Sequence, residues 1–402
     1  MPIRGSLPKV VSSVENATIV TLGGLIEGGS IIIRDGRIAE ILRRDSASTE
    51  QRGSANRIDA RDKIVVPGMI DIHTHGVQGG SALDSKAESI RKMCKHFPSH
   101  GVTGFLPTTC AEPRDVLVET ARSVAEIIRE GAPASGAQVL GLNLEGPFIS
   151  KVKPGAQPPS FIRDPSFEEF EEICEASGEN VKLITVAPEL KGSLEFIRRA
   201  RAKGVVIAAG HSNATYDEMI AGIGAGITHA SHTYNAMREF KHRDPGMLAA
   251  ILTNDEVTAE LIADNVHVHE GAMKLLIKAK GVGRIVAVSD SMPLAGMPDG
   301  EYDLMGFKIK MKNQVLTLPG GQLAGSGTTL EKSMRVMTVN LGIPLSDAVL
   351  MTATNPARII GIGGSKGSIE EGKDADLAIL NKEDLSVHAT IIKGQVAYQR
   401  SY

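Results

Sequence analysis

The feature that most constrains the fold is an alternation between short apolar runs and amphipathic segments in the middle of the chain. Eight runs of strand length lie between residues 64 and 288, and segments with helical spacing of apolar residues separate most of them. Buried parallel strands appear as near-continuous apolar runs, and each needs a crossover, usually a helix, before the next. Eight such units predict a (β/α)₈ barrel. The expected strands are 64–72, 103–107, 139–144, 181–186, 205–209, 227–231, 257–263 and 284–288, and the expected helices are 85–97, 112–130, 167–176, 194–202, 216–225 and 270–279.

A doubly wound open sheet is the structural alternative to a barrel. It is disfavoured because no GxGxxG fingerprint follows a strand, and the glycine-rich segment at 361–364 comes too late in the chain. With 42% hydrophobic residues, only 3% aromatic residues and 43 glycines among 402 residues, the chain fits a parallel α/β protein better than an aromatic-rich sandwich.

Both ends of the chain have the pattern of short antiparallel strands. At the N-terminal end, Asp35-Gly36 is a strong two-residue hairpin signal between two apolar runs, and Gly394 marks a similar turn near the C-terminus. Neither end has enough strands for a stable sheet of its own. We therefore predict one small β-sandwich domain built from residues 1–65 and 358–402, and a barrel domain over 66–357 that carries an added hairpin at 302–318.

Charge and cysteine usage exclude several classes of partner. Lys and Arg number 44 against 47 Asp and Glu, so the net charge of −3 gives no reason to expect nucleic acid. No stretch reaches the ~18 apolar residues of a membrane span. Three cysteines without CxxC spacing make a disulfide framework improbable. We expect a soluble protein in a reducing compartment, the cytoplasm.

Two histidines close the first apolar run. His73 and His75 lie two residues apart in the segment DIHTHG, so both side chains point to the same side of the strand. Two adjacent imidazoles after a run of buried residues favour a divalent metal over a pair of core histidines, because neutral imidazole is the commonest metal ligand.

Further polar residues follow the later runs. The carboxyl ends of barrel strands meet at one rim, where (β/α)₈ enzymes build their sites. A set of histidines and carboxylates gathered there is typical of a catalytic zinc or similar metal site. His229 lies three residues before His232 and is expected on the other face of its strand. The residues expected at the rim are His73, His75, Glu145, His211, His232 and Asp290.

Six segments along the chain form a recognisable series. They are PGMIDIHTHG (67–76), LEGPF (144–148), GHSNA (210–214), HTYNAM (232–237), DNVH (264–267) and SD (289–290). In these segments the sequence resembles the amidohydrolase superfamily and, within it, the N-acetylglucosamine-6-phosphate deacetylases. The resemblance covers essentially the whole chain, and the segments run in the family's order. LEGPF and HTYNAM are the discriminating motifs, whereas HxH is common to the superfamily.

The resemblance implies a metal site and a proton shuttle. Glu145, His211 and His232 would bind the metal that activates water, and Asp290 would act as general base and then general acid. His73 and His75 would leave room for a second metal beside Glu145 and Asp290. One or two divalent ions are therefore expected, zinc above iron, manganese or cobalt. The fourth run lacks the bridging Lys of other branches, because its only Lys, Lys182, is at the strand's start, so Glu145 takes the bridging role.

The resemblance also implies a small-molecule sugar phosphate as substrate. The segment around Arg243 supplies a phosphate contact in the family, sometimes across a dimer interface, so a homodimer is expected. Gln157 stands where some members have His. The positions expected to bind substrate are Ala156, Asn235, Ala236, Arg243, His267, Ala324, Gly325 and Ser326.

The sequence leaves three hypotheses about the function open. The first is removal of the acetyl group from N-acetylglucosamine 6-phosphate. The second is another amidohydrolase, such as a deacetylase of the galactosamine epimer, a deaminase or a cyclic-imide hydrolase, although the last expects a Lys on the fourth strand. The third is a non-catalytic barrel, which expects missing ligands, whereas every expected ligand position is filled.

Overall fold

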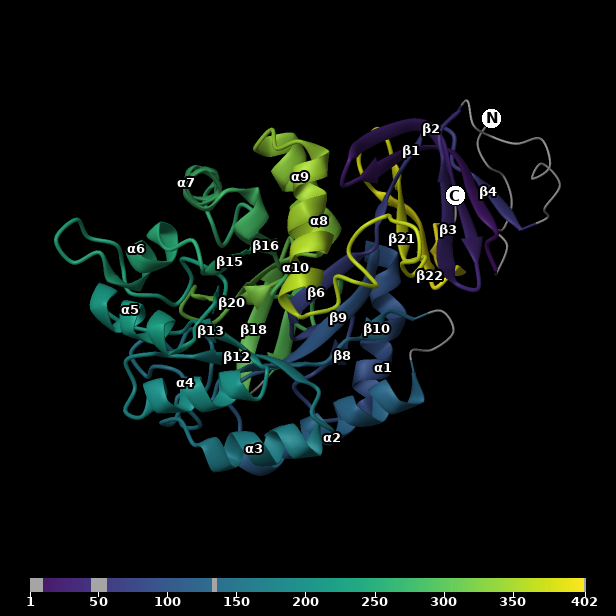
Figure 1. Cartoon of the computed structure of the whole chain (residues 1–402). Coiled ribbons are helices and arrows are strands. Elements are labelled where there is room, and N and C mark those ends of the chain that lie inside the picture. The colour runs from purple at the N-terminus through teal and green to yellow at the C-terminus, as the bar shows by residue number, and fades with distance from the viewer. Residues whose placement is uncertain (1–9, 45–55, 132–135, 305, 401–402) are drawn as a thin grey trace.

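The computed structural model of the chain describes residues 10–44, 56–131, 136–304 and 306–400. Residues 1–9 and 45–55 of the predicted terminal domain therefore lie outside the described residues, as does residue 305 of the predicted hairpin. A barrel with its helices and a sheet made from both chain ends are the two main parts of the molecule (Figure 1).

Eight parallel strands form a nearly closed barrel, which confirms the predicted fold class. Neighbouring strands are hydrogen-bonded in the order β6, β9, β11, β12, β13, β14, β15 and β16. Between the last and the first, the Asp290 amide donates to the His73 carbonyl at 2.9 Å, and the His75 amide donates to the Ser291 carbonyl at 2.8 Å. These bonds join the two sides at the carboxyl end of the barrel. The strands are β6 (Met69–Thr74), β9 (Val102–Thr109), β11 (Leu142–Glu145), β12 (Val181–Val186), β13 (Val206–Ala209), β14 (His229–Ala230), β15 (Thr258–Leu261) and β16 (Ile285–Ala287), with β10 (Gln138–Val139) added beside β9.

Helices cover the outside of the barrel (Figure 1). Their apolar faces follow the helical period: α2 buries Leu117, Ala121 and Val124. At α5 a local signal fixes the helix start, since Thr215 and Glu218 form a capping box there. The helices are α1 (Ala87–His96), α2 (Arg114–Glu130), α3 (Phe167–Ala176), α4 (Ser193–Ala202), α5 (Tyr216–Ala225), α6 (Gly246–Thr253), α7 (Glu270–Lys280), α8 (Leu330–Arg335), α9 (Leu345–Val349) and α10 (Asn355–Ile359).

Helix α6 was not predicted from the sequence. Its segment, GMLAAILT, is apolar at almost every position, so it has no amphipathic period to mark it as a helix. The C-terminal helices α8 to α10 are short and are joined through π-helical turns at Val336–Asn340 and Leu350–Thr354. No helix in the described ranges is long and apolar enough to cross a membrane.

Strands from the two ends of the chain build one sheet, as expected. The N-terminal and C-terminal strands lie side by side (Figure 1) and join where β21 pairs antiparallel with β5. The sheet has its own buried cluster, which includes Val14, Ile31 and Ile379. Its order is β23, β22, β21, β5, β1, β2 and β3, with β4 beside β1. The strands are β1 (Ser13–Thr21), β2 (Gly24–Arg34), β3 (Arg37–Leu42), β4 (Arg57–Asp59), β5 (Lys63–Pro67), β21 (Leu377–Asn381), β22 (Val387–Ile392) and β23 (Gln395–Gln399).

The apolar run at 64–72, expected as one barrel strand, is two strands. Strand β5 ends at Pro67 in the terminal sheet, and β6 begins at Met69 in the barrel. Gly68 separates them, and a Cβ at this position would lie 2.2 Å from the Thr103 hydroxyl oxygen. Only glycine therefore fits where the chain passes from the sheet into the barrel.

The predicted added hairpin belongs to a four-stranded antiparallel sheet. Its strands are β17 (Gly300–Leu304), β18 (Phe307–Lys312), β19 (Val315–Thr317) and β20 (Leu323–Ser326). Ile309, Met311 and Leu316 pack with Met292 in a separate apolar cluster. This sheet ends beside the carboxyl rim of the barrel, where Ser326 forms a bridge with Ser291. A further short ribbon, β7 (Gly76–Val77) with β8 (Gly80–Ser81), follows β6.

Candidate metal centre

The two histidines that end β6 both direct Nε2 toward the carboxyl end of the barrel. His75 Nδ1 lies 3.0 Å from the Thr108 carbonyl oxygen, and His73 Nδ1 lies 2.8 Å from a carboxylate oxygen of Glu260. An acceptor at Nδ1 fixes the tautomer in which Nδ1 carries the proton and Nε2 has a free lone pair. Both rings are thus held as ligands are in metal sites.

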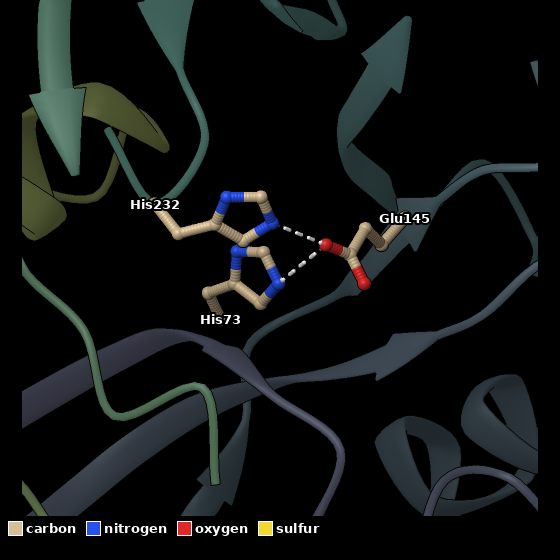
Figure 2. Close-up of side chains that lie close together, drawn as sticks. All are labelled: His73, Glu145 and His232. Carbon is tan, nitrogen blue, oxygen red and sulfur yellow. Dashed lines mark hydrogen bonds and ion pairs between the residues drawn. The ribbon is translucent and has the colours of Figure 1, made fainter. Parts of the chain in front are cut away.

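Glu145, at the end of β11, is the point on which four imidazoles converge. Its Oε1 lies 2.7 Å from His232 Nε2, 2.9 Å from His211 Nε2 and 3.4 Å from His73 Nε2. Its Oε2 lies 3.3 Å from His75 Nε2. Figure 2 shows the rings of His232 and His73 directed at the same carboxylate oxygen.

Asp290 follows β16, the strand that closes the barrel beside β6. Its Oδ1 lies 3.2 Å from His75 Nε2 and 3.7 Å from His73 Nε2. The structure therefore brings together all six side chains predicted at the rim. They come from the ends of β6 and β11 and from the turns after β13, β14 and β16.

Three of these side chains stand on backbone in the left-handed region. The φ angles are 45° at His211, 25° at His232 and 48° at Asp290. Such conformations cost about 1–3 kcal/mol each for residues other than glycine and collect at functional sites. The turns that follow β13, β14 and β16 thus direct these side chains toward the centre, and their backbone strain lowers the free energy of unfolding.

The centre concentrates buried charge. Burial alone would raise the pKa of Glu145, but His211, His73 and a hydrogen bond with His232 outweigh it and hold that pKa well below its usual range. Burial likewise opposes protonation of His73, yet Glu260 and Glu145 raise its pKa well above the usual value. Carboxylates packed among imidazoles in this way need positive charge at the centre, supplied by protons or by a cation.

A divalent metal fits this donor set. His73 Nε2 is buried and has no hydrogen-bond partner among the residues that the structure describes, although it faces two carboxylates. His211 Nε2 and His232 Nε2 lie 3.1 Å apart and point to the same place, as two ligands of one ion do. Imidazole nitrogens with carboxylate oxygens suit zinc and other borderline metals. Among the residues that the structure describes, three groups of three meet the spacing for an ion, namely His73 with Glu145 and His232, His73 with His75 and Asp290, and His75 with Cys110 and Glu145.

Glu260, which lies beneath the centre, was not predicted from the sequence as a functional residue. It is fully buried on β15, and besides His73 it contacts His229 Nε2 at 3.1 Å and accepts the backbone N–H of His232 at 2.8 Å. His229 therefore contacts Glu260 beneath the centre rather than Glu145. The available signal was a single carboxylate inside the apolar run 257–263, since a buried charge requires partners.

Gln157, in the loop that follows β11, holds Glu145 in place through hydrogen bonds at both ends of its amide group. Its amide nitrogen donates to Glu145 Oε2 at 2.8 Å, and its amide oxygen accepts the backbone N–H of Ala111 at 2.5 Å. The side chain thus fixes the carboxylate that four histidines share. The resemblance alone gave no role for Gln at this position.

A cavity of about 490 Å³ opens above the centre. Its wall includes His75, Glu145, His211, His232 and Asp290, together with five of the predicted substrate positions: Ala156, Asn235, Ala236, His267 and Gly325. Ala324 and Ser326 flank Gly325 and are buried. Arg243 is exposed in the loop before α6 and is not part of the cavity wall.

Besides Lys153, the described residues of the cavity wall outside the proposed ligands include one further group that can carry positive charge, the imidazole of His267. Asp264 Oδ2 lies 2.7 Å from the Nδ1 of His267, and the Nε2 of His267 is buried with no hydrogen-bond partner in the described part of the chain. Burial disfavours the charged ring, but Asp264 outweighs that effect and raises the pKa of His267 above its usual value. A protonated imidazole with one free N–H at a cavity wall suits an anionic ligand.

Comparisons with known proteins agree with this architecture. The model of the amidohydrolase family matches residues 64–397. The chain is 34% identical over 387 residues to the N-acetylglucosamine-6-phosphate deacetylase of Bacillus subtilis (strain 168), covering 96% of each chain. It is 35% identical over 379 residues to the N-acetylgalactosamine-6-phosphate deacetylase of Escherichia coli O157:H7, covering 94% of this chain and 97% of that one. The crystal structure of N-acetyl-D-glucosamine-6-phosphate deacetylase from Mycobacterium smegmatis superposes with a TM-score of 0.89 at 30% identity, over 96% of this chain and 100% of that one.

Proposed function

Because this chain belongs to the amidohydrolase family, we propose that it is an enzyme that hydrolyses the acetamide of N-acetylglucosamine 6-phosphate to glucosamine 6-phosphate and acetate. The observation that carries this proposal is the convergence of His73, His232 and His211 on Glu145 at the floor of a cavity. Relatives that match almost the full chain carry this activity in their names.

We assign the metal to the six side chains of the centre, with one or two ions per subunit and zinc as the resident metal. Glu145, His211 and His232 would hold the first ion, and His73, His75 and Asp290 would extend the site toward a second. When bound, such a metal lowers the pKa of water from about 15.7 toward 7 and polarises the amide carbonyl.

Asp290 carries the proton. Its carboxylate lines the cavity and lies near two histidines, His75 and His73, whereas Glu145 is surrounded by four. In the proposed reaction it accepts a proton from the attacking water and then donates it to the nitrogen of the departing amine. The Asp290 backbone is held by the hydrogen bond from its own amide to the His73 carbonyl, and its Oδ1 lies 3.2 Å from His75 Nε2.

The phosphate binds remote from the reacting amide. The free N–H of His267 and the polar groups of Asn235 and Ala236 would hold it, and Arg243 would add a cation. Ala156 and residues 324–326 would enclose the sugar. Binding energy at the phosphate then serves to orient the acetamide over the centre, so that the reaction gains from proximity.

A second candidate substrate is N-acetylgalactosamine 6-phosphate. The relative from Escherichia coli named for that epimer is 35% identical to this chain, which is no lower than the 34% of the Bacillus enzyme. The two sugars differ in the orientation of one hydroxyl group, so selection between them depends on a few contacts in the cavity.

We further propose a homodimer in the cytoplasm. The exposure of Arg243 outside the cavity of its own chain supports a role for this residue toward a partner's site. The three cysteines are buried and free, which fits a reducing compartment.

An acetate-release assay with metal-loaded protein tests the proposed reaction. We expect turnover of N-acetylglucosamine 6-phosphate that disappears on chelation and returns when zinc is added. The galacto epimer serves as the matched substrate, and a higher kcat/KM for it would transfer the assignment to the second candidate. Full turnover by protein shown to be metal-free would contradict the metal-dependent reaction.

A further inference from the structure

We propose that Cys110 is a ligand of the metal centre, through its thiolate, on the side of His75 and Glu145. This inference rests on the proposed metal-dependent function and adds a soft sulfur ligand to the histidines and carboxylates predicted from the sequence.

The position of Cys110 follows from the barrel order. It is the residue after β9, and β9 lies between β6, which ends in the histidine pair, and β11, which ends in Glu145. Thr109 pairs with Leu144 in the parallel register, so the next residues along the two strands, Cys110 and Glu145, lie level with each other. The fold therefore places a thiol at the rim between two of the proposed ligands.

The local distances suit a shared ion. One ligand atom each from His75, Cys110 and Glu145 lies within 4.8 Å of the other two. Zinc–sulfur bonds of about 2.3 Å and zinc–oxygen or zinc–nitrogen bonds of about 2.0–2.2 Å keep two ligand atoms of one ion within about 4.5 Å of each other, which is comparable with this limit. Cys110 is only 4% exposed, yet it lines the cavity.

The neighbours of the thiol leave it available. Its contact within the protein is with His75 Nδ1 at 3.7 Å, but the proton on that nitrogen is directed at the Thr108 carbonyl oxygen at 3.0 Å. A second observation points to a cation beside Glu145: within the described ranges His73 Nε2 has no hydrogen-bond partner, and this buried nitrogen faces Glu145 Oε1 at 3.4 Å.

Coordination by sulfur has a defined proton balance. A metal–sulfur bond forms, the S–H bond breaks, and one proton leaves for solvent. A thiolate favours soft and borderline ions such as zinc and cadmium over manganese and magnesium. The centre would therefore select its metal partly through Cys110.

The other two cysteines provide matched controls. Cys94 in α1 and Cys174 in α3 are also buried and free, but both belong to the hydrophobic core. Neither is among the residues that line the cavity.

The decisive experiment uses Co²⁺-loaded full-length protein. Thiolate ligation gives a near-ultraviolet sulfur-to-cobalt charge-transfer band, which nitrogen and oxygen ligands do not give. We expect this band in the unmodified protein and in Cys94→Ala and Cys174→Ala, and its loss in Cys110→Ser. Cadmium affinity should fall by about tenfold or more in Cys110→Ser, the lower end of what even an outer partner of a metal contributes, while manganese affinity changes less.

A measurement on the unmodified protein removes any dependence on the folding of the variant. X-ray absorption of the zinc-loaded protein should show a sulfur neighbour at about 2.3 Å. A shell of nitrogen and oxygen alone, or a charge-transfer band that persists in Cys110→Ser, would overturn the assignment. Deacetylation by a protein whose metal has no sulfur neighbour would leave the proposed function standing and reject only this inference. Protein that binds no metal would reject both.

Discussion

Glu260 Oε2 lies 2.8 Å from His73 Nδ1, so a carboxylate with no solvent exposure orients the first ligand of the proposed metal centre. The same oxygen accepts the backbone N–H of His232, and the other oxygen contacts His229. One side chain on β15 thus links the ends of β6 and β14. A carboxylate that accepts a hydrogen bond from the Nδ1–H of a ligand histidine raises the basicity of Nε2 and fixes the orientation of the ring.

The first prediction concerns Glu260. In Glu260→Gln the amide places a neutral group at His73 Nδ1, so metal affinity should fall by about 10–100-fold, as is typical when the outer partner of a ligand histidine is lost. A titration against a metal-buffering chelator measures the change. Glu331→Gln is the matched control, because Glu331 contacts His100 Nδ1 at 2.9 Å but neither residue lines the cavity. Equal affinity in both variants would contradict the role of Glu260.

The second prediction concerns Asp290 as the proton shuttle. Asp290→Asn keeps the shape of the side chain but removes its basicity, so kcat should fall by about 10²–10⁴-fold, the usual contribution of general acid–base catalysis. Acetate release at saturating substrate measures this, with metal content determined on the same sample. A near-normal kcat in a folded, metal-loaded variant would assign the proton transfer to another group.

The third prediction concerns the pH dependence of phosphate binding. Asp264 raises the pKa of His267 against the effect of burial, so the ring is charged below that raised pKa and loses its charge as the pH increases through it. Asp264→Asn removes the charge that stabilises the imidazolium, so the loss of affinity for glucosamine 6-phosphate should move to lower pH. Calorimetric titrations across pH follow the shift, with unphosphorylated glucosamine as the control ligand. Identical pH profiles for the two proteins would count against His267 as the phosphate cation.

The fourth prediction concerns Arg243. A hydrogen bond to a charged group is worth about 1.5–3 kcal/mol, so Arg243→Ala should lower kcat/KM for N-acetylglucosamine 6-phosphate by at least about tenfold. Lys241→Ala is the matched control, since Lys241 is an exposed cation in the same loop. Because Arg243 lies outside the cavity of its own chain, the mass of the protein in solution should be that of a dimer. Equal activity of the two variants would remove Arg243 from the phosphate site.

The barrel and its rim could be predicted because both depend on local patterns. Apolar runs mark the buried strands, and the residue that ends each run, such as His75 or Glu145, marks the rim. The pairing of β5 with β21 could be anticipated only in outline, because register between distant segments depends on tertiary packing.

Other parts of the site could not be predicted in this way. Glu260 lies within its strand rather than at the end, and its role depends on the neighbouring strand that carries His229. Cys110 gains its position from the order of strands around the barrel, which brings it level with Glu145. Helix α6 was missed because a helix that is apolar on most faces has the same pattern as a buried strand.

The most direct test compares the kcat/KM of the intact, zinc-loaded protein for N-acetylglucosamine 6-phosphate and for unphosphorylated N-acetylglucosamine. The proposed reaction requires both a centre that cleaves the amide and a remote group that orients the phosphate. Two charge-assisted contacts to phosphate, each worth about 1.5–3 kcal/mol, predict a preference of at least about 100-fold for the phosphorylated sugar. Equal kcat/KM for the two sugars would contradict the proposed phosphate site, and the remaining hypothesis would be an amidohydrolase without selectivity for phosphorylated sugars.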